Sequence, residues 1–149
     1  MKNIELLESA KALIEIQPNL ISILSNASAF LMESLPQINW VGFYLYDGIK
    51  LTVGPFQGKV ACSIIELGQG VCGEAAAFHM TKVVGNVLTY QNHIACDSNS
   101  RSEVVVPLVI KEQLFGVLDV DSPILNRFDS ATVLFLEQFV NLLLKTIDI

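Results

Sequence analysis

The spacing of apolar residues changes from helical to strand-like in the first third of the chain. Between about Asn3 and Leu35 apolar residues recur at intervals of three and four, and Pro18-Asn19 interrupts the run. This spacing is typical of helices with one buried face, so it predicts two helices, the second beginning at about Pro18. From Ile38 the period falls to two, which is typical of a half-buried strand.

Turn residues divide the rest of the chain into short elements. Asp47-Gly48 lies between an aromatic strand at 38–46 and an apolar run at 49–53, which is a strong signal for a hairpin. The later patterns predict, in chain order, a short helix after the glycines at 68, 70 and 73, a strand at 81–84, a hairpin formed by 104–110 and 114–121, and a last helix at 128–147 with Leu134, Phe135, Phe139, Leu142 and Leu143 on one side.

These elements describe one α+β domain that spans residues 1–149. We expect a central antiparallel sheet of about six strands, with the N- and C-terminal helices packed on one face. A chain of 149 residues has the length of a single domain and can bury a substantial core. The segment from Gly85 to Arg101 has no clear period, and a loop of that length inside a compact domain is usually functional.

Composition favours a globular chain with an extensive apolar surface. Hydrophobic residues make up 52% of the sequence and charged residues only 16%. This balance predicts either an unusually apolar surface or a large interface between subunits. We therefore expect a homodimer that uses the N-terminal and C-terminal helices.

Charge and the N-terminal sequence exclude several classes of protein. The net charge is −6 and the nine lysines and arginines never cluster, so a nucleic-acid partner is not expected. Glu5 and Glu8 occupy positions where a signal peptide would have its apolar core, and no apolar run approaches the roughly 18 residues of a membrane helix. We expect a cytoplasmic protein whose three cysteines are thiols rather than a structural disulfide framework.

Cys96 is the cysteine with the most polar surroundings. No apolar residue follows it until Val104, the start of a buried-type strand, so the thiol is predicted to lie on a loop held by that strand. A thiol reacts as the thiolate, which nearby cations stabilise. His93 and Arg101 are the candidate cations and Asp97 opposes them, so the local charge leaves two alternatives open: a reactive thiol, or a small apolar side chain under a loop.

Three carboxylates are predicted to share one face of the sheet. Asp119 and Asp121 lie two apart on a strand, so both project to the same side. Their repulsion would be costly in a buried place without a cation, and a substrate ammonium would be such a cation. Glu103, at the start of the neighbouring strand, completes a cluster that could recognise an amino group or protonate a leaving oxygen. The alternative is a solvated face of the hairpin.

The same thiols are poorly arranged for a metal. Cys62, Cys72 and Cys96 are separated by ten and twenty-four residues, and only His79 and His93 add further donors. Zinc sites favour closer spacings such as two cysteines separated by two residues. We expect no metal and no cofactor.

Five segments of the chain carry a resemblance to a known family. They are Trp40-Val41-Gly42-Phe43-Tyr44, Gly54-Pro55-Phe56-Gln57-Gly58, Gly70-Val71-Cys72-Gly73, Ser102-Glu103-Val104-Val105-Val106-Pro107 and Gly116-Val117-Leu118-Asp119-Val120-Asp121-Ser122. They resemble the free methionine-(R)-sulfoxide reductases, which are single GAF domains with enzymatic activity. The resemblance covers nearly the whole chain after the first helices, and the three cysteines keep the order and spacing of the family.

The resemblance implies a reaction that runs on thiols. It implies Cys96 as the nucleophile, Cys62 as the principal resolving thiol and Cys72 in a secondary role. The Cys96 thiolate would attack the sulfur of free L-methionine (R)-sulfoxide, and the resulting sulfenic acid would condense with Cys62 to a disulfide. A thioredoxin-type dithiol would then reduce that disulfide.

The resemblance also implies the walls of a substrate pocket. Glu103, Asp119 and Asp121 would line it, and Trp40 would lie against the methyl sulfoxide. The alternative function is a non-catalytic GAF domain that senses a cyclic nucleotide or an amino acid. Three spaced thiols have no task in such a sensor, so the reductase is the preferred hypothesis.

Overall fold

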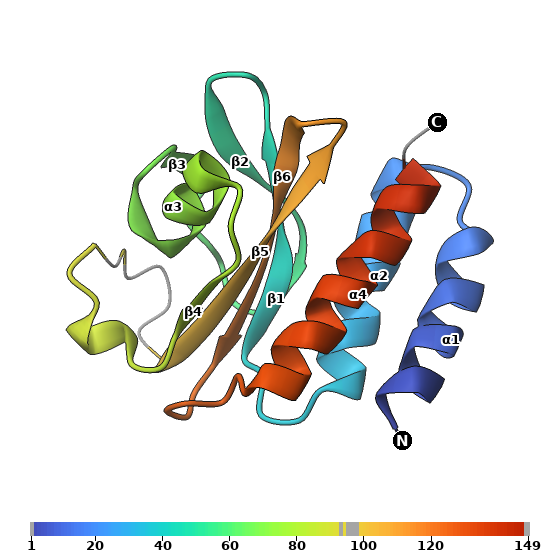
Figure 1. Ribbon diagram of the computed structural model, residues 1–149, viewed down its shortest axis with the longest axis horizontal. Coiled ribbons are helices and arrows are strands. Elements are labelled where there is room, and N and C mark those ends of the chain that lie inside the picture. Colours follow the sequence, from blue (N-terminus) through green and yellow to red (C-terminus); the bar gives the residue numbers. More distant parts are fainter. Residues whose placement is uncertain (1, 93, 95–98, 148–149) are drawn as a thin grey trace.

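A six-stranded antiparallel sheet with helices on both faces forms the structure (Figure 1). The computed structural model describes residues 2–92, 94 and 99–147. In chain order the elements are α1 (Asn3–Glu15), α2 (Leu20–Ser34), β1 (Trp40–Tyr46), β2 (Lys50–Gln57), β3 (Ile64–Glu66), α3 (Gly70–Phe78), β4 (Lys82–Val84), the 3₁₀ helix η1 (Val87–Thr89), β5 (Ser102–Ile110), β6 (Gln113–Ser122) and α4 (Ser130–Ile147). The strand order is β3-β2-β1-β6-β5-β4. Helices α1, α2 and α4 lie on one side of the sheet and α3 on the other, which confirms the predicted α+β class.

The break between the first two helices is set by an asparagine. Asn19 is the N-cap of α2, and its side chain accepts a hydrogen bond of 2.9 Å from the backbone amide of Ser22. Such a cap satisfies one of the amides that a helix leaves unpaired in its first turn. Pro18 therefore precedes the cap, and the second helix begins at Leu20 rather than at Pro18.

Helix α4 packs one side onto the sheet, but not quite the predicted side. Leu134 was expected to be buried and is 55% exposed. The residues of α4 that are buried are Phe135, Leu136, Phe139, Val140 and Leu143. With 18 residues and a mean hydropathy of 1.3, α4 is long and apolar enough to cross a membrane, which corrects the expectation that no segment comes close. Its buried residues belong to the core between the helices and the sheet.

Both predicted hairpins are confirmed. Between β1 and β2 the carboxylate of Asp47 accepts hydrogen bonds of 2.9 Å from the backbone amides of Ile49 and Lys50. Between β5 and β6 the two-residue turn consists of Lys111 and Glu112, with φ angles of 50° and 67°. Positive φ at both positions is the requirement of a type I′ turn, which asparagine and glycine meet with less strain.

The two faces of the sheet have different chemistry, as β6 shows most clearly. Leu118 and Val120 point toward α1, α2 and α4 and belong to the apolar core on that side. Asp119 and Asp121 point to the opposite side, where they line a pocket. Because side chains alternate along a strand, one strand contributes to both the core and the pocket.

Candidate active site

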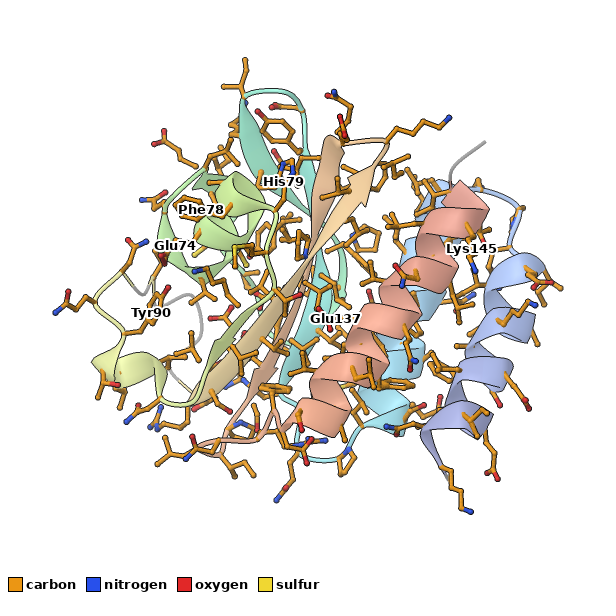
Figure 2. The ribbon with its side chains drawn as sticks, viewed as in Figure 1. Glu74, Phe78, His79, Tyr90, Glu137 and Lys145 are labelled. Atoms are coloured by element: carbon orange, nitrogen blue, oxygen red, sulfur yellow. The ribbon has the colours of Figure 1, made fainter. Side chains whose placement is uncertain are left out.

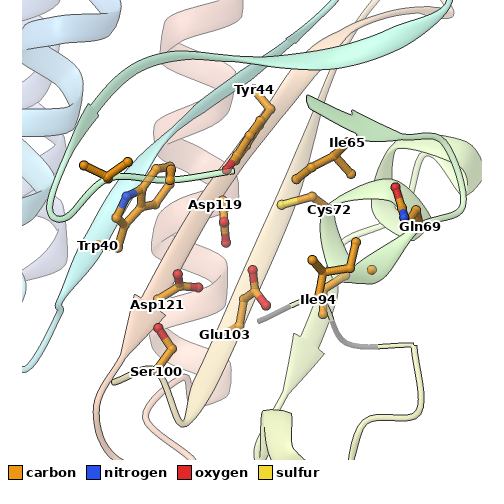
Figure 3. A pocket seen from close by; sticks show the side chains of 14 residues that line it. Trp40, Tyr44, Ile65, Gln69, Cys72, Ile94, Ser100, Glu103, Asp119 and Asp121 are labelled. Carbon is orange, nitrogen blue, oxygen red and sulfur yellow. The ribbon is translucent and has the colours of Figure 1, made fainter. Parts of the chain in front are cut away.

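A pocket lies between the sheet and the N-terminal end of α3 (Figure 3). Its empty volume is about 520 Å³, part of which is open to solvent. Five of the seven residues predicted for the site line it, namely Trp40, Cys72, Glu103, Asp119 and Asp121. They come from four elements, β1, α3, β5 and β6, so only the folded sheet brings them together.

The register of the strands places the acidic residues side by side. Asp121 pairs with Trp40 on β1 and with Glu103 on β5. Asp119, one step further along the same face, pairs with Gly42 on β1. Residues directly opposite each other on neighbouring strands have Cβ atoms about 4.5–5.5 Å apart. The three carboxylates therefore form one cluster beside the indole of Trp40.

Aromatic packing holds Trp40 as a fixed apolar wall. Its ring stacks on Phe56 with the centroids 5.1 Å apart, and on Tyr44 with the centroids 5.9 Å apart. The indole Nε1 donates a hydrogen bond of 3.1 Å to the carbonyl of Lys59. Gly58 passes so close that a Cβ there would come within 2.6 Å of the indole. Phe56 and Tyr44, which the sequence did not single out, thus set the position of the predicted wall.

Burial raises the pKa of two carboxyls in the acidic cluster. Glu103 is 7% exposed and Asp119 is 5% exposed. Loss of solvent raises the pKa of Glu103 well above its ordinary value, and the charge of Asp119 raises it further. Loss of solvent also raises the pKa of Asp119, with the charge of Asp121 adding to it. No lysine, arginine or histidine is among the described residues that line the pocket. Glu103 and Asp119 are consequently expected to hold protons until a cation arrives.

Cys72 lies beside the carboxyls, in the first turn of α3. It is a buried free thiol. Its sulfur and one carboxyl oxygen each of Glu103 and Asp119 all lie within 4.8 Å of one another. Burial raises the pKa of the Cys72 thiol, and the charges of Asp119 and Glu103 raise it further. Cys72 is therefore poorly suited to be a thiolate nucleophile.

Of the other two cysteines, only Cys62 lies among the described residues. Cys62 lies in the connection between β2 and β3, and it is disulfide-bonded. The hydroxyl of Tyr44 donates a hydrogen bond of 3.1 Å to its carbonyl oxygen. Cys96 and His93 lie outside the described residues, so their predicted roles stay predictions.

Contacts with α3 and with the turn before it hold the segment that leads toward Cys96, and no motif in the sequence predicted them. The hydroxyl of Tyr90 donates a short hydrogen bond to the carboxylate of Glu74 in α3 (Figure 2). The amide of Asn92 donates a hydrogen bond of 2.9 Å to the carbonyl of Gly68, and Ile94 lines the pocket. Tyr90 and Glu74 are sixteen residues apart, which no local pattern connects.

Comparisons with known proteins place these observations in a family. Residues 19–147 match the family model described as GAF domain. The chain is 45% identical over 136 residues to the free methionine-R-sulfoxide reductase of Escherichia coli strain K12, which covers 91% of this chain and 82% of that protein. It is also similar to the solved structure of fRMsr of Staphylococcus aureus in complex with substrate, with a TM-score of 0.93 and 46% identity over 98% of this chain and 95% of the other.

A third comparison gives the same result. The structure of free methionine-R-sulfoxide reductase from Neisseria meningitidis in complex with its substrate matches with a TM-score of 0.94 and 40% identity, and the match covers 98% of this chain and 88% of the other. At this coverage the similarity includes the strands and the helix that carry the pocket.

Proposed function

The chain belongs to the GAF domain family and, within it, to the free methionine-R-sulfoxide reductases, and from this we propose that it reduces free L-methionine (R)-sulfoxide to L-methionine in the pocket between the sheet and α3. The observation that carries the proposal is the pairing of a buried acidic cluster with a fixed aromatic wall. A free amino acid with a methyl sulfoxide side chain has an ammonium group that fits the carboxyls and a methyl group that fits the aromatic wall.

The acidic cluster selects the ammonium group of the free amino acid. Glu103 and Asp119 are buried and have raised pKa values, so binding of an ammonium group would allow them to ionise and to accept charge-assisted hydrogen bonds. Asp121 lies on the same face. The methyl sulfoxide would then lie against Trp40. A methionine sulfoxide inside a polypeptide has no ammonium group and would leave the carboxyls unpaired.

The chemical steps that we propose use two thiols and one proton. The Cys96 thiolate attacks the sulfoxide sulfur while a protonated carboxyl of the cluster gives its proton to the oxygen. The oxygen passes to the cysteine, methionine leaves as the reduced thioether, and Cys96 becomes a sulfenic acid. The thiol of Cys62 attacks that sulfur, so a disulfide forms and water leaves. A dithiol of the thioredoxin class then restores both thiols by exchange.

The state of the cysteines supports this division of labour. Cys62 is disulfide-bonded, which is the state that a resolving thiol reaches after one turnover, and Cys72 is a free buried thiol. The raised pKa of Cys72 argues against it as nucleophile or resolving thiol. Cys72 keeps in this proposal a catalytic role secondary to that of Cys62, beside Asp119 and Glu103.

Single-turnover assays with cysteine variants test the proposal. The reduced protein should lose two thiols for each methionine formed when no external reductant is present. Cys96→Ser should form no methionine, whereas Cys62→Ser should form one equivalent and then stop. Cys72→Ser serves as the matched control and should keep the stoichiometry of the parent. Binding of the sulfoxide without loss of thiols would favour a sensor, and the opposite order of the two variants would reverse the roles.

A homodimer remains our proposal for the assembly. Large apolar side chains are exposed on the N-terminal and C-terminal helices that were predicted to form the interface, including Ile4 on α1, Ile21 on α2 and Leu134 on α4. A partner that covers them would remove this surface from water. Light scattering over a dilution series should show a dimer at the higher concentrations, and a monomer at every concentration would refute it. A cytoplasmic location fits recycling by thioredoxin and is proposed with it.

A further inference from the structure

We propose that the reduced protein without substrate binds a thiophilic divalent cation of the zinc type at Cys72, Glu103 and Asp119, and that this cation and the substrate exclude each other. The site itself does not depend on the proposed reaction, whereas the exclusion rests on the proposed position of the substrate ammonium group. The spacing of the cysteines argued against zinc, but folding supplies a different set of donors, one thiol from α3 and two carboxylates from β5 and β6.

The donor atoms are already close to the arrangement that zinc requires. The sulfur of Cys72 and the carboxyl oxygens of Glu103 and Asp119 lie within 4.8 Å of one another. Around a tetrahedral zinc with bonds of about 2.0–2.3 Å, neighbouring donors are roughly 3.3–3.8 Å apart. Side-chain rotation that shortens the separations by up to about 1.5 Å would complete the geometry. A thiolate among the donors favours zinc over calcium or magnesium, which take oxygen donors.

An unsatisfied buried oxygen points independently to a missing ligand. Glu103 and Cys72 hydrogen-bond to the Asp119 side chain, but its Oδ1 atom is buried and has no hydrogen-bond partner in the part of the chain that the structure describes. The side chain is 5% exposed and is directed into the pocket between Asp121 and Glu103 (Figure 3). A buried acceptor without a partner is destabilising, so groups of this kind are usually satisfied by a ligand or an ion. A cation at the cluster would satisfy this oxygen.

A cation can reach the cluster from solvent through the pocket, where it would compete with the substrate ammonium group. All three donors line the pocket, part of whose volume is open to solvent. Water or the nearby carboxylate of Asp121 can fill the fourth position of a tetrahedral site. The carboxylates that would hold zinc are the same ones proposed to hold the substrate ammonium, so each ligand removes the partner that the other needs.

The test uses a variant in which Cys72 is the only thiol. In reduced Cys62→Ser/Cys96→Ser protein, Co²⁺ should bind with a stoichiometry of one and give a thiolate-to-cobalt charge-transfer band. Zn²⁺ affinity is measured by competition with a chromophoric chelator. Adding Cys72→Ala should abolish the band and weaken Zn²⁺ binding at least 100-fold, and Asp119→Asn should weaken it at least tenfold. Near-ultraviolet circular dichroism of each variant checks that the fold is retained.

Control measurements separate this site from weaker surface binding and from the proposed reaction. Glu15→Gln, on α1 at the other face of the sheet, should leave Zn²⁺ affinity unchanged. Methionine sulfoxide binding is followed by the fluorescence of Trp40, the one tryptophan of the sequence, and saturating sulfoxide should weaken Zn²⁺ binding. A band that survives Cys72→Ala, or no band at all, would overturn the site. Unchanged Zn²⁺ affinity with bound sulfoxide would overturn the exclusion, and zinc binding in a protein that does not bind the sulfoxide would support the site while counting against the proposed function.

Discussion

Replacing Asp119 by asparagine should make the protein more stable and a worse enzyme. Asp119 is 5% exposed and burial raises its pKa. At neutral pH the folded protein must therefore either keep a proton on this carboxyl or hold the charged form away from water, and both cost free energy. Asparagine has nearly the same shape and no charge. The substitution removes a buried ionisable group, and the desolvation penalty of a poorly paired buried group is about 1–3 kcal/mol. For a chain of this length about 1 kcal/mol moves the thermal midpoint by roughly 2–4 °C, so we expect a rise of roughly 2–12 °C near pH 8.

The stability gained by Asp119→Asn is expected to depend on pH. The folded-state pKa of Asp119 lies above the unfolded value, so the stability it contributes is fully present below the unfolded pKa and is lost as the pH rises through the folded pKa. The advantage of Asp119→Asn should therefore be absent near pH 4 and grow toward pH 8. Thermal unfolding of the reduced proteins at several pH values measures it. In the same variant kcat/KM for free methionine sulfoxide should fall about 10- to 100-fold, because a charge-assisted hydrogen bond of about 1.5–3 kcal/mol is lost.

A control of opposite sign comes from the start of α4. The backbone amide of Thr132 donates a hydrogen bond of 2.9 Å to the carboxylate of Asp129, and hydrogen bonding by Thr132 lowers the pKa of Asp129. Its contribution is present above the unfolded pKa and is lost as the pH falls through the folded pKa. Asp129→Ala should therefore destabilise the protein at neutral pH and lose that effect in acid, with kcat/KM unchanged. If Asp119→Asn were no more stable than the parent at pH 8, or equally favoured at pH 4 and pH 8, the account of the acidic cluster would be wrong.

The substrate ammonium group, the contact between Tyr90 and Glu74 and the turn between β5 and β6 each allow a further test. N-acetylation of methionine sulfoxide should nearly eliminate turnover, because the acetylated substrate has no ammonium group for the acidic cluster; comparable kcat/KM for the free and acetylated forms would contradict the carboxylate assignment. Tyr90→Phe removes the donor to Glu74 and should lower kcat/KM several-fold while the thermal midpoint moves by less than about 2 °C, and an unchanged kcat/KM would mean that the bond has no part in positioning the loop. Lys111→Asn with Glu112→Gly should raise the free energy of unfolding by about 1–2 kcal/mol in denaturant titrations, because both positions have positive φ; no gain would show that the turn is not strained.

Local patterns predicted the parts of the site that depend on strand alternation. Asp119 and Asp121 were expected on one face because they are two apart, and the hairpin register placed Glu103 opposite Asp121. The hairpin at Asp47 followed from a single dipeptide. Each of these inferences concerns residues that are close in sequence or joined by a short turn, where backbone geometry alone decides the outcome.

Contacts between distant segments were beyond such reasoning. Cys72 reaches the acidic cluster only because α3 crosses the face of the sheet, and the bond between Tyr90 and Glu74 joins a loop to that helix. Leu134 was misplaced for a related reason, because the helical period identifies an apolar side without saying where its edges fall against the sheet. The family resemblance supplied the roles of the cysteines, which no spacing could have supplied.

The alternation along β6 limits the kinds of mutation that this strand can accept. Point substitutions at Asp119 or Asp121 change the pocket and leave Leu118 and Val120 in place, so binding can be altered without rebuilding the core. An insertion or deletion of one residue in β6 would instead exchange the faces, sending carboxylates among the apolar helices and leucine and valine into the pocket. In a mutational scan, Asp119 and Asp121 should accept replacements that leave the protein folded, whereas Leu118, Val120 and the length of the strand should tolerate almost no change.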